Sequence, residues 1–69
     1  MRIIVNGEEK MIEKEPILVS ELLEICEVEQ PDMVSVQLNG EFVKKENFQI
    51  TELKNEDEVE FLYFMGGGR

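Results

Sequence analysis

The sequence contains no histidine and only one cysteine, Cys26. Histidine is the most common general base, the usual activator of a nucleophilic cysteine and the most common zinc ligand. Its absence argues against hydrolytic chemistry within this chain. A single cysteine excludes an internal disulfide, which is consistent with a reducing compartment. Because Cys26 lies in an apolar stretch, we expect it to fill space in the core rather than to handle sulfur.

Basic residues are also scarce, with seven Lys and Arg against sixteen Asp and Glu and a net charge of −9. Binding to phosphates requires clusters of Lys and Arg, so the composition argues against a nucleic-acid partner. An acidic surface favours a protein partner with a basic docking face. The same charge would also keep a small protein soluble, and composition alone does not separate these two roles.

Long apolar runs are missing from the 69 residues. A membrane span needs about 20 consecutive apolar residues, and a signal peptide needs a basic start followed by an apolar stretch. We therefore expect no membrane association and a cytoplasmic location. A chain of this length forms one domain with a thin core. Such a domain has little room for a deep substrate pocket.

Two Asn-Gly pairs predict two β-hairpins, because both central residues of a type I′ turn require a positive φ. Asn6-Gly7 joins predicted strands at residues 2–5 and 8–14. Asn39-Gly40 follows residues 34–38, where apolar and polar residues alternate, and leads into a strand at residues 42–43. The alternation indicates a strand with one buried and one wet face, Gln37 lying on the wet side.

Between the hairpins, the sequence predicts one short helix at residues 21–28, with Ser20 as its N-cap. The apolar positions recur at helical spacing: Leu22, Leu23, Ile25, Cys26 and Val28. The helix is expected to end before Pro31, because proline disfavours helical geometry in the residue that precedes it.

The second half predicts an irregular connection, a polar turn at residues 54–57 and a last strand at residues 58–64. Phe48, Ile50 and Leu53 are expected to enter the core from the connection. The resulting order of hairpin, helix, hairpin and strand indicates an α+β fold, with a mixed sheet of four to five strands and one main helix packed on one face. The order of the strands does not follow from periodicity.

The C-terminal residues form a glycine tail, defined as residues 66–69, after a folded domain at residues 1–65. Gly66, Gly67 and Gly68 lose too much backbone entropy on ordering to belong to a stable strand, so we expect a flexible arm. Extended, three residues reach roughly 10 Å, which suits a narrow channel in a partner. A frayed terminus is the alternative reading of the same glycines.

The last strand has two faces that the sequence distinguishes. Glu60 indicates that its own face is wet, which would leave Leu62 and Phe64 exposed on that face next to the glycine tail. Val59, Phe61 and Tyr63 would point the other way. Exposed apolar residues beside a reactive end are typical of a docking patch for a partner protein. Alternatively, Phe64 could fold over an edge of the sheet.

Taken together, these segments resemble the ThiS family of sulfur carriers, within the ubiquitin-like β-grasp superfamily that also includes the MoaD-like proteins. The similarity covers the whole chain, and its most specific part is the turn, strand and glycines at the C-terminus. The segments that carry it are IIVNG at residues 3–7, VSELL at 19–23, VQLNGEFV at 36–43 and LKNEDEVEFLYFMGGG at 53–68. The resemblance implies a β-grasp fold.

The resemblance also implies a carrier rather than an enzyme. In such families a ThiF- or MoeB-like activating enzyme uses ATP to adenylate the terminal glycine, and sulfur derived from a cysteine desulfurase then replaces AMP. By position, Gly68 would carry the thiocarboxylate, and Gly66 and Gly67 would thread the partner's active site. The sulfur would pass to thiazole synthase for thiamine biosynthesis. No cofactor would be bound by this chain, since ATP belongs to the partner.

Arg69 departs from the family pattern, because such carriers normally end at glycine. A protease could remove it, since some carriers resembling ThiS are made as tailed precursors. It could also be a cloning remnant, or the chain could carry no sulfur. Other functions stay open: supplying sulfur for molybdopterin or another metabolite, modifying target lysines as a ubiquitin-like protein, or acting as an interaction module with an inert tail.

Overall fold

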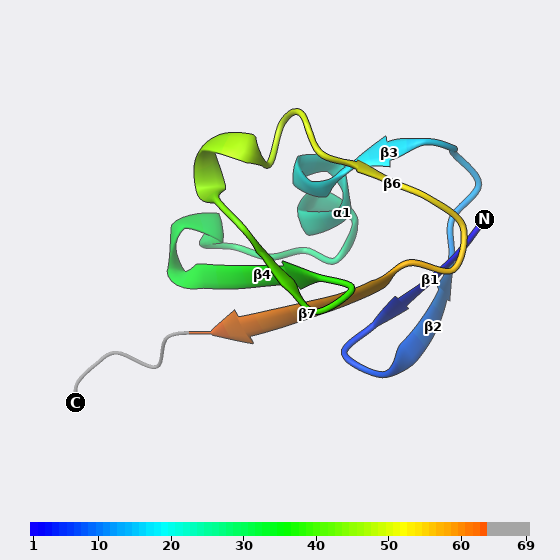
Figure 1. Ribbon diagram of the computed structural model, residues 1–69, viewed down its shortest axis with the longest axis horizontal. Coiled ribbons are helices and arrows are strands. Elements are labelled where there is room, and N and C mark those ends of the chain that lie inside the picture. The colour runs from blue at the N-terminus through cyan, green and yellow to red at the C-terminus, as the bar shows by residue number, and fades with distance from the viewer. Residues whose placement is uncertain (64–69) are drawn as a thin grey trace.

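A five-stranded mixed sheet carries the fold of the computed structural model, which describes residues 1–63. The order of strands is β2-β1-β7-β4-β5. Figure 1 shows β7 between β1 and β4. β1 and β7 are parallel, and the other neighbours are antiparallel. The predicted α+β class, with a mixed sheet of four to five strands, is therefore confirmed. The strands are β1 (Arg2–Val5), β2 (Glu8–Met11), β4 (Val34–Leu38), β5 (Glu41–Val43) and β7 (Glu58–Tyr63).

Both predicted hairpin turns are present. Asn6, Gly7, Asn39 and Gly40 all have positive φ, as a type I′ turn requires. The two asparagines also tie the hairpins to β7. Asn6 Oδ1 accepts a hydrogen bond of 2.8 Å from Phe61 N, and Asn39 Oδ1 accepts one of 2.9 Å from Glu58 N. Each turn therefore fixes a hairpin and also helps to place the last strand between β1 and β4.

The second strand of the first hairpin, β2, is shorter than predicted. β2 ends at Met11, whereas the prediction extended it to residue 14. Residues 13–16 have no apolar side chain to bury until the chain reaches Ile17, and they form a loop instead. Ile12, at the start of this loop, is buried in the core.

The helix α1 (Val19–Ile25) begins and ends earlier than predicted. Leu18, not Ser20, is its N-cap, and Glu21 Oε1 accepts a hydrogen bond of 2.8 Å from Leu18 N. The predicted N-cap was wrong because this glutamate supplies the capping contact one turn into the helix. The apolar stripe is also narrower than expected, since Ile25 is exposed. α1 lies across one face of the large sheet (Figure 1).

A small second sheet joins β3 (Ile17–Leu18) to β6 (Glu52–Leu53) in antiparallel pairing. The sequence did not predict it, because a strand of two residues has no alternation to read. Short 3₁₀ turns, η1 (Pro31–Met33) and η2 (Lys45–Asn47), complete the connections. In the connection after η2, Phe48 and Leu53 are buried as expected, but Ile50 is 71% exposed, so its predicted core role was wrong.

The core lies between α1 and the sheet and is apolar throughout the described residues. Cys26 is partly buried and packs against this core, and burial raises the pKa of its thiol. Both observations match the space-filling role expected for it. The buried side chains are Ile3, Val5, Ile12, Ile17, Val19, Leu22, Leu23, Val34, Val36, Val43, Phe48, Leu53, Val59 and Phe61.

Glu21 provides a pH-dependent contribution to stability. The hydrogen bonds that its carboxylate accepts from the Lys14 ammonium, with Nζ and Oε2 2.5 Å apart, and from Leu18 N lower the pKa of the carboxyl from its usual value. A carboxyl whose pKa is lower in the folded state than in the unfolded state stabilises the protein at pH values above its unfolded-state pKa. This stabilisation is lost as the pH falls through the folded-state pKa. We therefore expect Glu21→Gln to unfold at a lower temperature than the parent at pH 7, and we expect this difference to shrink as the pH is lowered through the range in which the carboxyl titrates. A series of thermal unfolding measurements from pH 7 into the acid range checks this, with the exposed Glu29→Gln as control.

The end of α1 contains a strained residue. Val28 N donates to Leu23 O and Glu27 N donates to Glu24 O, each at 3.0 Å, which is a Schellman motif. Glu27 occupies the left-handed position with φ of 60°. We expect Glu27→Gly to stabilise the protein by about 1 kcal/mol, or roughly 4–8 °C in a domain of this size. Glu27→Ala, which removes the same charge but keeps a Cβ, should give no such gain in thermal unfolding.

Candidate functional site

The described residues place the strand that leads to the glycine tail. β7 is the central strand of the large sheet, and its last residue, Tyr63, pairs with Val34 at the start of β4. Contacts with β1 and β4 thus hold the chain up to Tyr63 (Figure 1). Phe64, Gly66, Gly67, Gly68 and Arg69 lie outside the described residues, so the structure does not test their predicted roles.

Leu62 lies on the face of the sheet opposite α1, which we call the open face. It pairs with Ser35, while its neighbour Phe61 pairs with the fully buried Val36 on the helix side. Residues paired across two strands share a face, so Leu62 and Ser35 lie on the open face. Leu62 is 50% exposed. The predicted exposure of Leu62 is therefore confirmed.

Phe42 is a second apolar side chain on the open face, and sequence reasoning did not single it out. It pairs with Gln37, which in turn pairs with Glu60 of β7. Phe42 is 63% exposed. The signal was available, because a two-residue turn at Asn39-Gly40 sets Phe42 opposite Gln37, a residue of the wet face. Phe42 and Leu62 thus flank β4 on the same surface.

Tyr63 behaves differently from the two residues with which it was grouped. Its pairing with Val34 places it on the helix side, as the alternation predicted for Val59, Phe61 and Tyr63. Val59 and Phe61 are buried, but Tyr63 is 53% exposed because the sheet ends beside it. At the end of β7 the two successive residues Leu62 and Tyr63 are therefore exposed on opposite faces of the sheet.

A site within residues 1–63 could draw on titratable and metal-ligating side chains and on exposed apolar surface. Within residues 1–63, no cluster of three or more Cys, Asp or Glu side chains is arranged to hold a metal ion. The hydrogen bond to Lys14 and the capping contact with Leu18 N explain the lowered pKa of Glu21, and burial explains the raised pKa of Cys26. Among the helices of this part of the chain, none has the length and apolar character needed to cross a membrane.

The order of strands, the single helix on one face and the exposed open face define a small β-grasp protein. The chain belongs to the ThiS family, since the model of that family matches residues 1–68. A crystal structure of the thiamine biosynthesis protein ThiS from Geobacter metallireducens is 46% identical, with a TM-score of 0.88, and the match covers 99% of this chain and 100% of that one.

A solution NMR structure of a thiamine biosynthesis protein from Geobacter metallireducens gives a TM-score of 0.82 at 46% identity. That match covers 100% of this chain and 90% of the other. A comparison with curated proteins gave no significant match. The high TM-scores over nearly whole chains agree with the predicted β-grasp fold.

Proposed function

We propose that this chain is a sulfur carrier of thiamine biosynthesis that is adenylated and then thiocarboxylated at Gly68. The observation that carries the proposal is the match to the ThiS family, which extends through all three tail glycines and stops at residue 68, before Arg69. The solved structures named as thiamine biosynthesis proteins support thiazole formation as the destination of the sulfur. In this role the chain is a co-substrate of other enzymes and not a catalyst.

The chemistry requires a free carboxylate at Gly68. A carboxylate is a poor electrophile, so a carboxylate oxygen first attacks the α-phosphorus of ATP and pyrophosphate leaves. A persulfide sulfur of the partner then attacks the acyl carbon and AMP leaves. A second thiol breaks the S–S bond, which gives the thiocarboxylate and a disulfide on the partner. ATP and the thiols belong to a ThiF- or MoeB-like enzyme and to the desulfurase-derived donor, and thiazole synthase receives the sulfur.

The folded body supplies the affinity that holds the tail in place. Ordering the backbone costs about 1–2 kcal/mol per residue, and Gly66, Gly67 and Gly68 contribute no side-chain contacts to offset it. The open face supplies exposed apolar contact area through Leu62 near the end of β7 and through Phe42 on β5, on the other side of β4. We assign partner docking to these two residues and to Phe64. Glycines allow close approach of the partner backbone along the threading segment.

Arg69 has to be removed for this chemistry, and we assign its removal to a protease. Mass spectrometry of the protein from its native cell tests the proposal. We expect a species that ends at Gly68, accompanied by one heavier by about 16 Da, because sulfur replaces oxygen in a group that only exists at a free C-terminus. A population with intact Arg69 throughout would contradict the proposal, and conjugates of Gly68 with lysines would instead indicate a protein modifier.

A further inference from the structure

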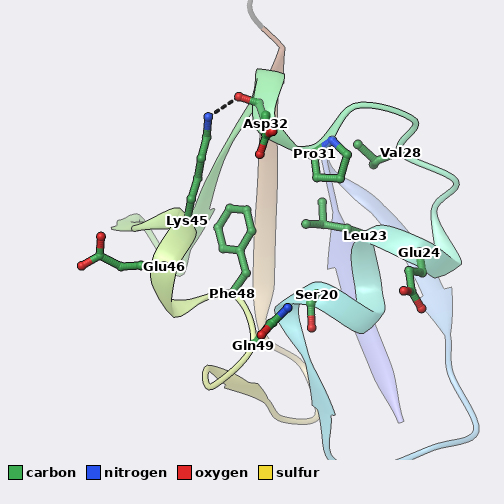
Figure 2. A pocket seen from close by; sticks show the side chains of 10 residues that line it. All are labelled: Ser20, Leu23, Glu24, Val28, Pro31, Asp32, Lys45, Glu46, Phe48 and Gln49. Atoms are coloured by element: carbon green, nitrogen blue, oxygen red, sulfur yellow. Dashed lines mark hydrogen bonds between the residues drawn. The ribbon is translucent and has the colours of Figure 1, made fainter.

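A pocket of about 480 Å³ lies on the helix side of the molecule, between α1, the segment around η1 and the residues around η2 (Figure 2). We call it the helix-side pocket. Leu23, Val28, Pro31 and Phe48 provide its apolar lining. Leu23 and Phe48 are anchored in the core, so the floor of the pocket is a fixed part of the fold. The volume suits one or two large apolar side chains from a partner.

The helix-side pocket lies at the end of the sheet where β7 ends. Pro31 and Asp32 line it and belong to η1, which runs directly into β4. The first residue of β4, Val34, pairs with Tyr63. Tyr63 is exposed on the helix side, and Leu62 is exposed on the open face. A protein that takes up the glycine tail therefore meets apolar surface on both faces of the sheet.

The rim of the helix-side pocket is acidic. Glu24, Asp32 and Glu46 are exposed around it, and Lys45 is the one basic residue among those that line it. The Lys45 ammonium donates a hydrogen bond to the backbone carbonyl of Asp32 across the pocket (Figure 2). None of the ion pairs within residues 1–63 involves these three carboxylates, and the lining carries three carboxylates against one ammonium. An apolar floor inside an acidic rim complements an apolar side chain flanked by Lys or Arg.

We propose that the helix-side pocket is a second docking site, which receives an apolar side chain flanked by basic residues of the ATP-dependent activating enzyme. This inference rests on the proposed function. The activating enzyme is the partner whose site must hold the phosphates of ATP and the tail carboxylate together. Such a site requires basic groups around it, and their charge is opposite to that of the pocket rim. The activating enzyme would then contact the folded body on both faces of the sheet, at the open face and at the helix-side pocket.

Charge reversal tests the proposal with a matched control. Chains ending at Gly68 are prepared as the parent, as Glu24→Lys/Glu46→Lys at the pocket rim, and as Glu8→Lys/Glu13→Lys, two exposed carboxylates outside the pocket lining. Both double variants change the net charge equally. In calorimetric titration with the activating enzyme, we expect the rim variant to bind at least about tenfold more weakly at low salt and the control less than about threefold. The loss should shrink as ionic strength rises.

A variant that fills the helix-side pocket tests the proposal without changing the charge. Gln49 is exposed and lines the pocket, so Gln49→Trp should occupy it without disturbing the core, and the unfolding midpoint checks that the fold is intact. We expect about a tenfold loss of affinity for the activating enzyme. Parent-like binding of both pocket variants, or a loss confined to thiazole synthase, would overturn the proposal. So would a dimer of this chain that Gln49→Trp abolishes. Failure of the parent to be adenylated would instead refute the proposed function.

Discussion

A chain that ends at Gly68 is expected to support ATP–pyrophosphate exchange by its activating enzyme, whereas the chain that ends at Arg69 should support almost none. With Arg69 present, the carbonyl of Gly68 is part of a peptide bond, and the nearest free carboxylate is about 3.5 Å farther along the chain. A misplacement of about 1 Å can cost about a hundredfold in rate. We therefore expect a difference of at least about a thousandfold in the rate of exchange.

The matched control is a chain that ends at Gly67, which displaces the carboxylate by one residue in the opposite direction and adds no side chain. We expect it to be as inactive as the intact chain. If the Gly67 chain were active and the intact chain inactive, the bulk and charge of the Arg69 side chain would explain the effect instead of the carboxylate position. Equal exchange by the intact chain and the Gly68 chain would contradict the assignment of Gly68 as the adenylated residue.

Local signals in the sequence predicted the elements whose geometry is set within a few residues. The two Asn-Gly turns fix their hairpins because positive φ at both positions is rare outside such turns. The alternation at residues 34–38 predicted the buried and wet faces of β4 correctly. The exposure of Leu62 followed from the same period-two reasoning applied to β7. Each of these features depends on a pattern that one strand or turn contains by itself.

Features that depend on contacts distant in the sequence were not predictable. The parallel pairing of β1 with β7 joins Ile4 to Glu58, and nothing in either strand specifies its partner. The sheet of β3 and β6 forms because Ile17 and Leu53 are both buried and face each other across two-residue strands. The start of α1 moved to Val19 because Glu21 caps it through Leu18 N.

The candidate site likewise combines a feature that local sequence could have predicted with one that depends on distant contacts. Phe42 could have been found by extending the hairpin register from Asn39-Gly40 to its pair Gln37. The helix-side pocket could not, because its lining comes from three segments that only the tertiary fold brings together. Ile50 shows the converse error, where an apolar residue in a connection was assigned to the core although the chain turns outward there. Hydrophobicity alone does not distinguish a core residue from an exposed one in an irregular segment.

Truncation of the open face is expected to separate binding from stability. We predict that Leu62→Ala/Phe42→Ala weakens binding to the activating enzyme by about 1,000-fold, because central apolar anchors at an interface contribute about 2 kcal/mol each. Both side chains are at least half exposed in the free protein. Their removal should therefore cost the fold no more than about 1 kcal/mol in total. Calorimetric titration gives the affinity, and chemical denaturation gives the free energy of unfolding.

Met11→Ala is the matched control for this variant. Met11 is 76% exposed and lies on β2 at the edge of the sheet, paired with Arg2 rather than with the end of β7. Its truncation removes a similar exposed apolar side chain and should leave the affinity within about twofold of the parent, as expected for residues outside a central binding cluster. Equal losses of affinity and unfolding free energy in the double variant would show that Leu62 and Phe42 serve the fold. Similar losses of affinity in the double variant and Met11→Ala would mean that apolar surface anywhere on the sheet drives binding, without a docking site beside the tail.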